Sequence, residues 1–210
     1  MDRKQIKKLF RKTWHFIWED NSIWSWLVNI VLAFILIKFI VYPGLGFILS
    51  TSHPIVAVVS SSMEHNADFE EWWSRSGVWY ASNNITKDDF LGFSLRAGFN
   101  KGDIMVLKGG KPKDIKIGDV IVFRSARVNP KPDPIIHRIV QIEDQDGKIV
   151  YQTKGDNYRT NSKQINGCFP DGCIYESDIW GSQIIGRAVA RIPFLGWVKI
   201  AFVELVNLLR

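Results

Sequence analysis

Cysteine and histidine are scarce in this chain of 210 residues, which has two cysteines and four histidines. The two cysteines have no histidine near them in the sequence, so the ligand spacing of a structural zinc site is absent. Internal repeats and low-complexity tracts are absent as well, which excludes solenoid architectures. Nothing in the sequence requires a metal ion or an organic cofactor.

Long apolar runs are also few. The hydrophobic fraction of 46% is ordinary for a globular protein and excludes a polytopic membrane protein. The exception is residues 23–42, which carry a single charge, Lys38. At about 1.5 Å per residue, this stretch is long enough to span the hydrocarbon core of a bilayer. A chain of this length therefore holds one domain of ordinary size, or a smaller domain with membrane elements.

Basic residues concentrate before the apolar stretch. Residues 1–21 contain six lysines and arginines against three acidic residues, in a chain whose net charge is +6. A basic end beside an apolar segment is typical of a cytoplasmic membrane flank rather than of a nucleic-acid-binding patch. We interpret residues 1–21 as a basic amphipathic segment at the cytoplasmic membrane surface; a solvated tail is the alternative.

The apolar stretch is too long for the core of a secretory signal peptide and lacks a small-x-small cleavage site. Residues 22–43 are therefore predicted to be an uncleaved transmembrane anchor, with Pro43 and Gly44 marking its exit. Since the basic flank stays inside, everything after about residue 50 is expected outside the membrane.

The remainder of the chain is rich in short β-branched runs separated by glycine, aspartate and proline, which is typical of a mostly-β domain. These runs lie at residues 55–59, 104–107, 120–123, 135–142, 149–153 and 184–192. The predicted extracytoplasmic β domain covers residues 51–190. Residues 64–100 interrupt it as a polar and aromatic insertion, helical near residues 69–74, whose tryptophans pack onto the sheet, rest on a membrane or line a groove.

The C-terminal segment and the two cysteines each leave two alternatives open. Residues 191–210 are apolar but short for a span, which favours a membrane-surface helix over a second crossing. Cys168 and Cys173 lie in a glycine-containing loop, and in an extracytoplasmic domain they form either a local disulfide or two free thiols.

Three places in the sequence stand out as candidates for chemistry: a serine cluster, a histidine and an aspartate. Residues 60–62 are serines that follow an apolar run, which suits an exposed nucleophile as well as an ordinary serine-rich turn. A serine needs a base, and His137 lies alone among isoleucines and valines, where a buried structural histidine is the alternative. Asp156, at the end of another apolar run, is the leading candidate to orient that imidazole, although aspartate is also common in turns.

Six short motifs occur in a fixed order that resembles type I signal peptidase. They are Ser-Ser-Ser-Met at 60–63, Lys-Gly-Asp-Ile at 101–104, Gly-Asp-Val-Ile-Val-Phe-Arg at 118–124, Ile-His-Arg-Ile-Val at 136–140, Thr-Lys-Gly-Asp-Asn at 153–157, and residues 185–197. The resemblance covers roughly residues 30–64 and 99–198. It is closest to the archaeal and endoplasmic-reticulum branch, which carries histidine where the bacterial enzymes carry lysine.

The resemblance implies a mainly-β fold with an N-terminal transmembrane helix and a C-terminal apolar helix. It implies a serine endopeptidase in the cell membrane that removes signal peptides from exported preproteins, with the lipid membrane as its other partner and without nucleic acid. Ser62 matches the nucleophile, His137 the general base and Asp156 the aspartate of the Gly-Asp-Asn motif. Ser60 matches the hydroxyl residue that helps to hold the oxyanion.

The sequence departs from the pattern of this family at the acid. Many relatives have a second aspartate six residues after the Gly-Asp-Asn aspartate, and here that position is Ser162. The orienting group is therefore Asp156, or Asp171 or Asp178 outside the motif, or none in a Ser–His dyad. His65 also stands where the family usually has proline, and the 64–100 insertion is longer than expected.

Two other functions remain open at this point. A catalytically inactive, membrane-tethered binding subunit would explain Ser162 in place of aspartate. A self-cleaving repressor-type protease would share the Ser-Met motif, but it would use a lysine base and lack an anchor.

Overall fold

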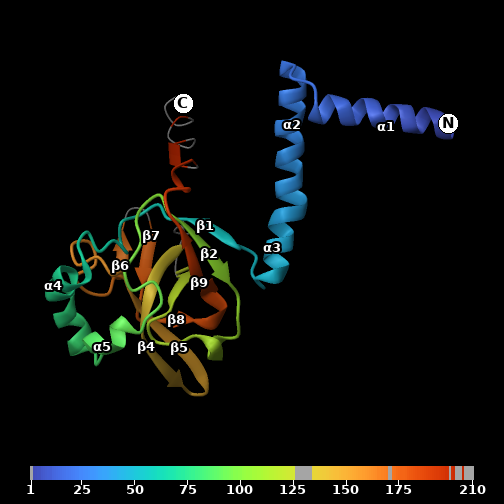
Figure 1. The fold of residues 1–210 in the computed structure, drawn as a ribbon. Helices are drawn as coiled ribbons and strands as arrows, with labels where there is room; N and C mark the ends of the chain where they lie inside the picture. The colour runs from blue at the N-terminus through green and yellow to red at the C-terminus, as the bar shows by residue number, and fades with distance from the viewer. Residues whose placement is uncertain (1, 126–133, 170–171, 199, 202–204, 206–210) are drawn as a thin grey trace. The chain divides into compact units, whose positions relative to one another are not determined.

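The computed structural model describes residues 2–125, 134–169, 172–198, 200–201 and 205 (Figure 1). The chain divides into two compact units, Met1–Ile48 and Leu49–Arg210, which are described separately.

The first unit is helical. Helix α1 (Arg3–Trp18) is followed by α2 (Ile23–Leu36), a π-helical segment η1 (Ile37–Val41) and α3 (Tyr42–Ile48). Helix α1 leaves α2 sideways (Figure 1), because the buried Ser25 hydroxyl donates to the Phe16 carbonyl at 2.6 Å. The Asn29 amide likewise donates to the Ile17 carbonyl at 2.9 Å. Two polar side chains of α2 thus satisfy carbonyls at the end of α1 that have no partner within the helix.

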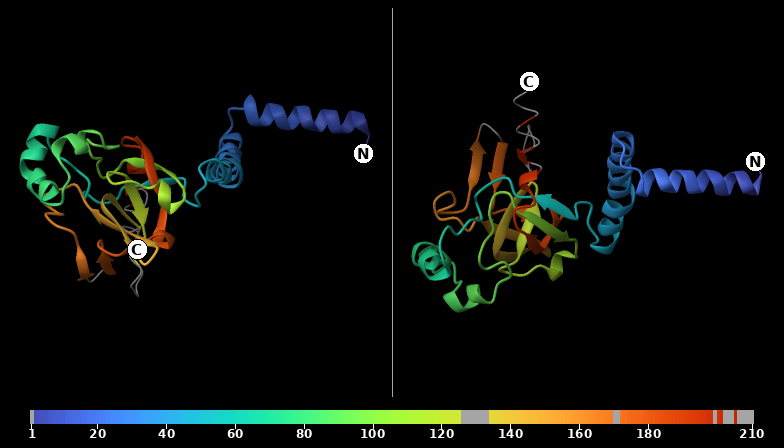
Figure 2. Two further views of the ribbon diagram at one scale, coloured as in Figure 1. Left: turned by 90° about the horizontal axis from the view of Figure 1, so that it is seen from below. Right: turned by 45° about the horizontal axis from the view of Figure 1, so that its top comes forward.

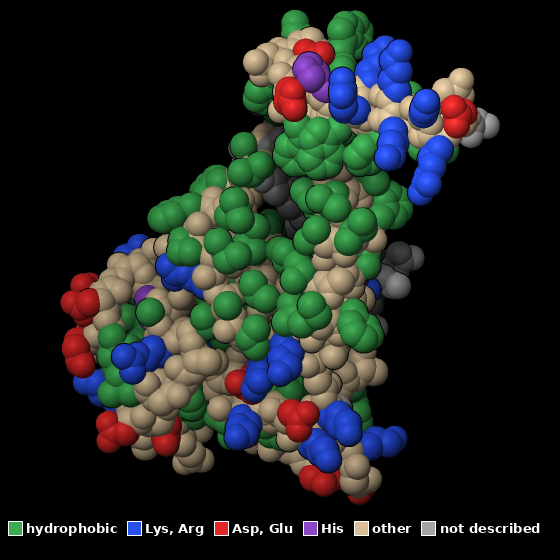
Figure 3. Space-filling model, turned by 45° about the vertical axis from the view of Figure 1, so that its right-hand side comes forward, with side chains coloured by type: hydrophobic (Ala, Val, Ile, Leu, Met, Phe, Trp, Pro, Cys, Tyr) green, Lys and Arg blue, Asp and Glu red, His purple; other side chains and the backbone are tan. Residues whose placement is uncertain are grey.

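The helical stretch Ile23–Ile48 has 26 residues and a mean hydropathy of 2.2, so it is long and apolar enough to cross a membrane. Figure 3 shows apolar side chains along it and basic side chains gathered on α1. The helix continues past Pro43 to Ile48, beyond the exit expected at Pro43 and Gly44. The turn before Pro43 is a wider π-turn, in which the Tyr42 N–H donates to the Ile37 carbonyl. This turn accommodates the proline ring, which would clash with a carbonyl of the preceding turn in a regular α-helix.

The second unit is built on one antiparallel sheet in the order β1-β2-β9-β3-β4-β5-β8. These strands are β1 (Ile55–Ala57), β2 (Ile104–Lys108), β3 (Val120–Phe123), β4 (Ile135–Gln145), β5 (Lys148–Lys154), β8 (Ile179–Trp180) and β9 (Ile184–Ile192). The mainly-β prediction is confirmed, and each of the six predicted apolar runs overlaps one of these strands. Short 3₁₀ turns, η2 (Pro112–Asp114) and η3 (Gly181–Gln183), lie between strands.

A separate hairpin, β6 (Asn166–Phe169) and β7 (Gly172–Tyr175), stands beside the sheet in both views of Figure 2 and was not predicted. Cys168 and Cys173 are register partners across it and form a disulfide. Of the two alternatives left open by the sequence, the structure therefore has the local disulfide.

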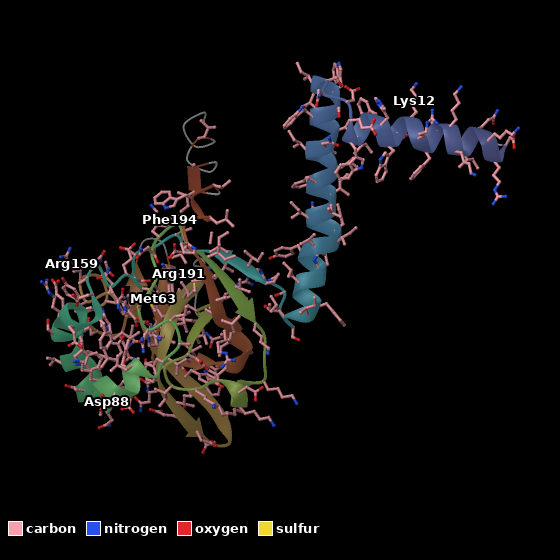
Figure 4. The ribbon with its side chains drawn as sticks, in the orientation of Figure 1. Lys12, Met63, Asp88, Arg159, Arg191 and Phe194 are labelled. Atoms are coloured by element: carbon pink, nitrogen blue, oxygen red, sulfur yellow. A yellow bond between two sulfur atoms is a disulfide. The ribbon has the colours of Figure 1, made fainter. Side chains whose placement is uncertain are left out.

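The central strand β3 is buried on both faces, because its side chains alternate between two apolar clusters. Val120 and Val122 face one cluster with Met63, while Ile121 and Phe123 face the other. Figure 4 shows Met63 inside the domain, close to the sheet. The core thus anchors the residue that follows the three serines.

The 64–100 insertion folds into two helices, α4 (Phe69–Ser82) and α5 (Lys87–Leu91). Asp68 and Thr86 cap their N-termini by accepting a hydrogen bond from the backbone N–H three residues on. Their aromatic residues pack around Trp72, which has no exposed surface, and against Val140 of β4. Packing onto the sheet, one of the three expected roles of the insertion tryptophans, is thus the role of Trp72.

Strand β9 ends at Ile192. The first described helical residue after it is Trp197. Phe194, before it, points away from the domain (Figure 4) and is 71% exposed. Most of the C-terminal helix expected in residues 191–210 lies outside the described residues, which beyond Val198 are Ile200, Ala201 and Leu205.

Candidate active site

Ser62 lies in a tight turn that the core holds in place. The Glu64 N–H donates to the Ser61 carbonyl at 3.1 Å, which closes a turn with Ser62 and Met63 at its centre. Met63 is 1% exposed, and its carbonyl accepts from the Phe99 N–H at 3.1 Å. Ser62 is only half-buried. In the Ser-Met pair, the serine is therefore half-buried and the methionine is buried in the core.

The turn is fastened to the segment that follows β5. The Asn157 N–H donates to the Ser62 carbonyl at 2.9 Å, and the Asn157 side-chain amide donates to the Ser61 carbonyl at 2.8 Å. Gly155 permits this approach, since a Cβ there would lie 2.7 Å from the Ser62 oxygen and 2.6 Å from the Asn161 side chain. The Gly-Asp-Asn motif therefore has a geometric reason for its glycine and its asparagine.

Ser60 lies beside Ser62. Their hydroxyl oxygens are hydrogen-bonded at 3.2 Å, and Ser60 is exposed. Two hydroxyl groups, separated by one residue in the sequence, therefore meet at the surface of the domain.

His137 lies on β4. The β4–β5 ladder pairs Arg138, the residue after His137, with Lys154, the residue before Gly155. A Cβ at Gly155 would lie 2.7 Å from the Ser62 carbonyl oxygen, so the segment that follows β5 lies against the Ser62 turn. The strand that carries His137 is therefore paired with the strand whose end contacts this turn. Within the described residues, no hydrogen bond joins the side chains of His137 and Ser62.

The carboxylate that contacts His137 is Glu176, which was not singled out in the sequence. Glu176 follows β7, is 0% exposed, and its Oε1 is hydrogen-bonded to His137 Nδ1. Its Oε2 accepts from the Ile165 N–H at 2.6 Å, and Oε1 accepts from the Thr153 hydroxyl at 3.3 Å. A single acidic residue beside a short hairpin carries no local signal of such a role.

Asp156 belongs to a different group of buried side chains. It accepts hydrogen bonds from Arg138 (2.6 Å at the shortest), from the Tyr80 hydroxyl at 2.9 Å and from His65 Nε2 at 3.1 Å. Burial alone would raise the pKa of the Asp156 carboxyl, but the Arg138 charge and the hydrogen bonds from His65 and Arg138 hold that pKa well below its usual value. None of the hydrogen bonds of the described residues joins Asp156 to His137.

His65, at the position where the resemblance expects proline, is part of this second group. Its ring stacks on the Trp72 indole with centroids 3.8 Å apart and planes 2° from parallel. The indole Nε1–H of Trp72 in turn donates to the backbone carbonyl of Asp156 at 3.0 Å. The insertion is therefore joined to the Gly-Asp-Asn segment through these two rings.

Lys154 contributes a cation near both acids. Its ammonium donates to the Gly155 carbonyl at 2.8 Å and lies 5.1 Å from the ring centroids of Trp79 and Tyr80. Burial lowers the pKa of Lys154 to about 8, although the charges of Asp156 and Glu176 oppose this decrease.

The other candidate acids are less well placed. Ser162, at the position of the missing aspartate, is exposed, and no hydrogen bond among the described residues joins the half-buried Asp178 to His137. Asp171 lies outside the described residues. Across the part of the chain that the structure describes, no three histidine, cysteine, aspartate or glutamate residues gather as a metal site would require.

Similar proteins were found among signal peptidase subunits, although no family profile matches the chain. Human signal peptidase complex catalytic subunit SEC11C is 30% identical over 111 residues, which are 52% of this chain and 53% of that protein. The resemblance to type I signal peptidase is confirmed. Signal peptidase complex catalytic subunit SEC11 of Komagataella phaffii is 27% identical over 171 residues (79% of this chain and 76% of that protein). The chain thus spans about half the length of SEC11C and about three quarters of the yeast protein.

Proposed function

We propose that this chain is a membrane-anchored serine endopeptidase that removes signal peptides from exported preproteins. One observation supports the proposal: the Asn157 N–H, just after β5, donates to the Ser62 carbonyl, and β5 is paired with β4, the strand that carries His137. The homologues named as catalytic subunits of the signal peptidase complex point to the same activity.

In the proposed reaction, His137 Nε2 removes the proton of the Ser62 hydroxyl while Ser62 Oγ bonds to the scissile carbonyl carbon. The tetrahedral intermediate collapses when its C–N bond breaks and His137 donates the proton to the leaving amine. Water, deprotonated by His137, then hydrolyses the acyl-enzyme and releases Ser62. Catalytic hydrogen bonds often tighten only in the substrate complex, which accounts for a free enzyme without a Ser62–His137 bond.

Ser60 is proposed as an oxyanion donor together with the backbone N–H of Ser62. Its hydroxyl is 3.2 Å from Ser62 Oγ and so lies next to the carbonyl under attack. Removing one such donor typically lowers the rate on the order of 100- to 1000-fold. Asp156 supports the site less directly in this proposal, since it holds Arg138, the neighbour of the base on β4.

The membrane part of the proposal rests on the first unit. The helix Ile23–Ile48 would be the anchor, and the basic α1 would lie on the cytoplasmic membrane surface with its lysines and arginines toward acidic headgroups. Residues after about 50 would then be extracytoplasmic. Because the enzyme and the signal peptide share one membrane, their effective concentration rises.

The substrate would be the extracytoplasmic end of a signal peptide with small side chains one and three positions before the cut. Strand β1 ends the sheet order, and three residues after it the chain reaches Ser60. An extended peptide is therefore proposed to add beside the sheet as a further strand.

The test compares two serines of the same turn. The full-length protein in detergent is given a preprotein, with Ser62→Ala as the test variant and Ser61→Ala as the matched control. We expect Ser62→Ala to lose cleavage by about 1000-fold or more and Ser61→Ala to stay within about threefold of the parent. Equal cleavage by Ser62→Ala would rule out the nucleophile. A folded parent that binds the preprotein without cutting it would instead be a binding subunit.

A further inference from the structure

We propose that Glu176 is the positioning carboxylate of this site and that it holds the His137 imidazole with Nε2 toward Ser62. The inference rests on the proposed function. It assigns to Glu176, which has no counterpart in the motifs of the resemblance, the role that the sequence analysis expected of Asp156.

Glu176 is buried without a basic side chain among its hydrogen-bond partners other than His137. It is 0% exposed, and its oxygens are engaged by the Ile165 N–H, the Thr153 hydroxyl and His137 Nδ1. Burying a carboxylate is costly unless charged or polar donors compensate for lost water. An imidazole that gains a proton during catalysis supplies a positive charge in direct hydrogen-bond contact with this carboxylate, which its other hydrogen-bond partners do not.

The contact also determines which ring nitrogen carries the proton. An ionised carboxylate can only accept hydrogen bonds, so His137 Nδ1 donates to Glu176. The neutral ring then has its lone pair on Nε2, for which the described residues offer no hydrogen-bond partner. This is the tautomer that a base for Ser62 requires.

The alternative carboxylate is already occupied. Arg138, Tyr80 and His65 all donate to the two oxygens of Asp156, which is 0% exposed. Turning Asp156 toward His137 would leave the buried Arg138 guanidinium without its anion, which is strongly unfavourable. Asp156 therefore pairs with Arg138, and Glu176 pairs with the neighbouring residue of β4, His137.

The disulfide hairpin fixes the backbone of Glu176. The Glu176 N–H donates to the Ile165 carbonyl and to Asn166 Oδ1, both at 3.0 Å, and the Glu176 carbonyl accepts from the Thr153 N–H at 2.8 Å. The Cys168–Cys173 disulfide joins the two strands of the hairpin that ends one residue before Glu176. The carboxylate is thus held from the hairpin on one side and from β5 on the other.

The decisive variant is Glu176→Gln, with Asp178→Asn as the matched control two residues away. Glutamine keeps the size of the side chain and an acceptor for the Ile165 N–H, but its NH₂ group would donate to His137 Nδ1 and favour the wrong tautomer. We expect kcat for preprotein cleavage to fall by about 100- to 10,000-fold with KM within about threefold, and Asp178→Asn to match the parent.

Two further measurements separate positioning from folding. Glu176→Asp keeps the charge, so it should recover at least tenfold of the activity lost in Glu176→Gln. In ¹H NMR spectra, the parent and Ser62→Ala should share a far-downfield imidazole N–H signal that Glu176→Gln and His137→Gln lack. The NMR comparison uses Ser62→Ala because that variant keeps the His137–Glu176 pair intact.

The outcomes are distinguishable from failure of the proposed function. If Glu176→Gln cleaves like the parent while Ser62→Ala is inactive, the positioning role is wrong and the serine protease stands. If the parent and Ser62→Ala show no downfield signal, or if Glu176→Asp recovers nothing in a folded protein, the positioning role is also wrong. If Ser62→Ala remains active, the proposed function itself fails.

Discussion

The domain contains two buried histidine–carboxylate pairs that differ in what surrounds them. His137 contacts Glu176, and His65 contacts Asp156. Both carboxylates are 0% exposed, and both histidines are at most 4% exposed. Yet Asp156 also accepts from the Arg138 guanidinium, whereas the hydrogen-bond donors to Glu176 other than His137 are neutral.

This difference separates a structural pair from a chemical one. Arg138 pairs with Asp156, and the Trp72 ring stacks on His65, so the surrounding structure holds both members of this pair. The hydrogen-bond donors to Glu176 other than His137 are neutral, so His137 is the ionisable side chain that this carboxylate contacts directly. A histidine–carboxylate pair therefore stabilises the fold in one place and, in our proposal, transfers a proton in the other.

The largest expected effect contrasts the two histidines. We expect His137→Gln to lower preprotein cleavage by about 1000-fold or more in a protein that remains folded. His65→Gln should do the reverse, keeping cleavage within about tenfold while unfolding at a lower temperature, because a stacked ring and a buried hydrogen bond are lost. Parallel assays of cleavage and thermal unfolding check this. The comparison breaks down if both variants lose only stability.

A smaller effect is expected from the structural carboxylate. Asp156→Asn leaves the buried Arg138 charge without its anion, so we expect the free energy of unfolding to fall by about 3–5 kcal/mol. Urea unfolding monitored by tryptophan fluorescence measures the change. Asp88→Asn on the exposed face of α5 (Figure 4) is the control and should stay within about 0.5 kcal/mol of the parent. Equal effects of the two substitutions would contradict the structural role of Asp156.

The smallest effect concerns Lys154, whose charge lies near both carboxylates. Its folded-state pKa of about 8 is below the ordinary 10.5, so between these values the unfolded chain binds more protons than the folded one. Stability contributed by this group therefore rises as the pH increases from about 8 to 10.5. The rise is on the order of 2–3 kcal/mol.

Lys154→Met removes this titration. We expect the free energy of unfolding of the parent, measured relative to Lys154→Met, to increase across that pH range and to be level between pH 6 and 7. Paired urea titrations at several pH values provide the measurement. A difference between the two proteins that stays constant from pH 6 to 10.5 would show that the Lys154 ammonium is not destabilised in the fold.

Local sequence pattern was sufficient for most of the sheet. Strands such as β3 and β9 were predicted with their observed bounds, since alternating β-branched residues between glycine and proline turns have few other stable conformations. The hairpin β6–β7 was missed, because the sequence left open whether Cys168 and Cys173 pair, and their disulfide joins the two strands. The helix end at Ile48 was missed because a π-turn accommodates Pro43.

For the site, the sequence by itself singled out Ser62 after an apolar run and His137 among the β-branched residues of a strand. These features depend on short-range chemistry and on the alternation of side chains along a strand. Only the tertiary structure decided which carboxylate meets which histidine. Acidic side chains are alike in the local sequence, and pairing across distant strands brings Glu176 to His137 and Asp156 to Arg138.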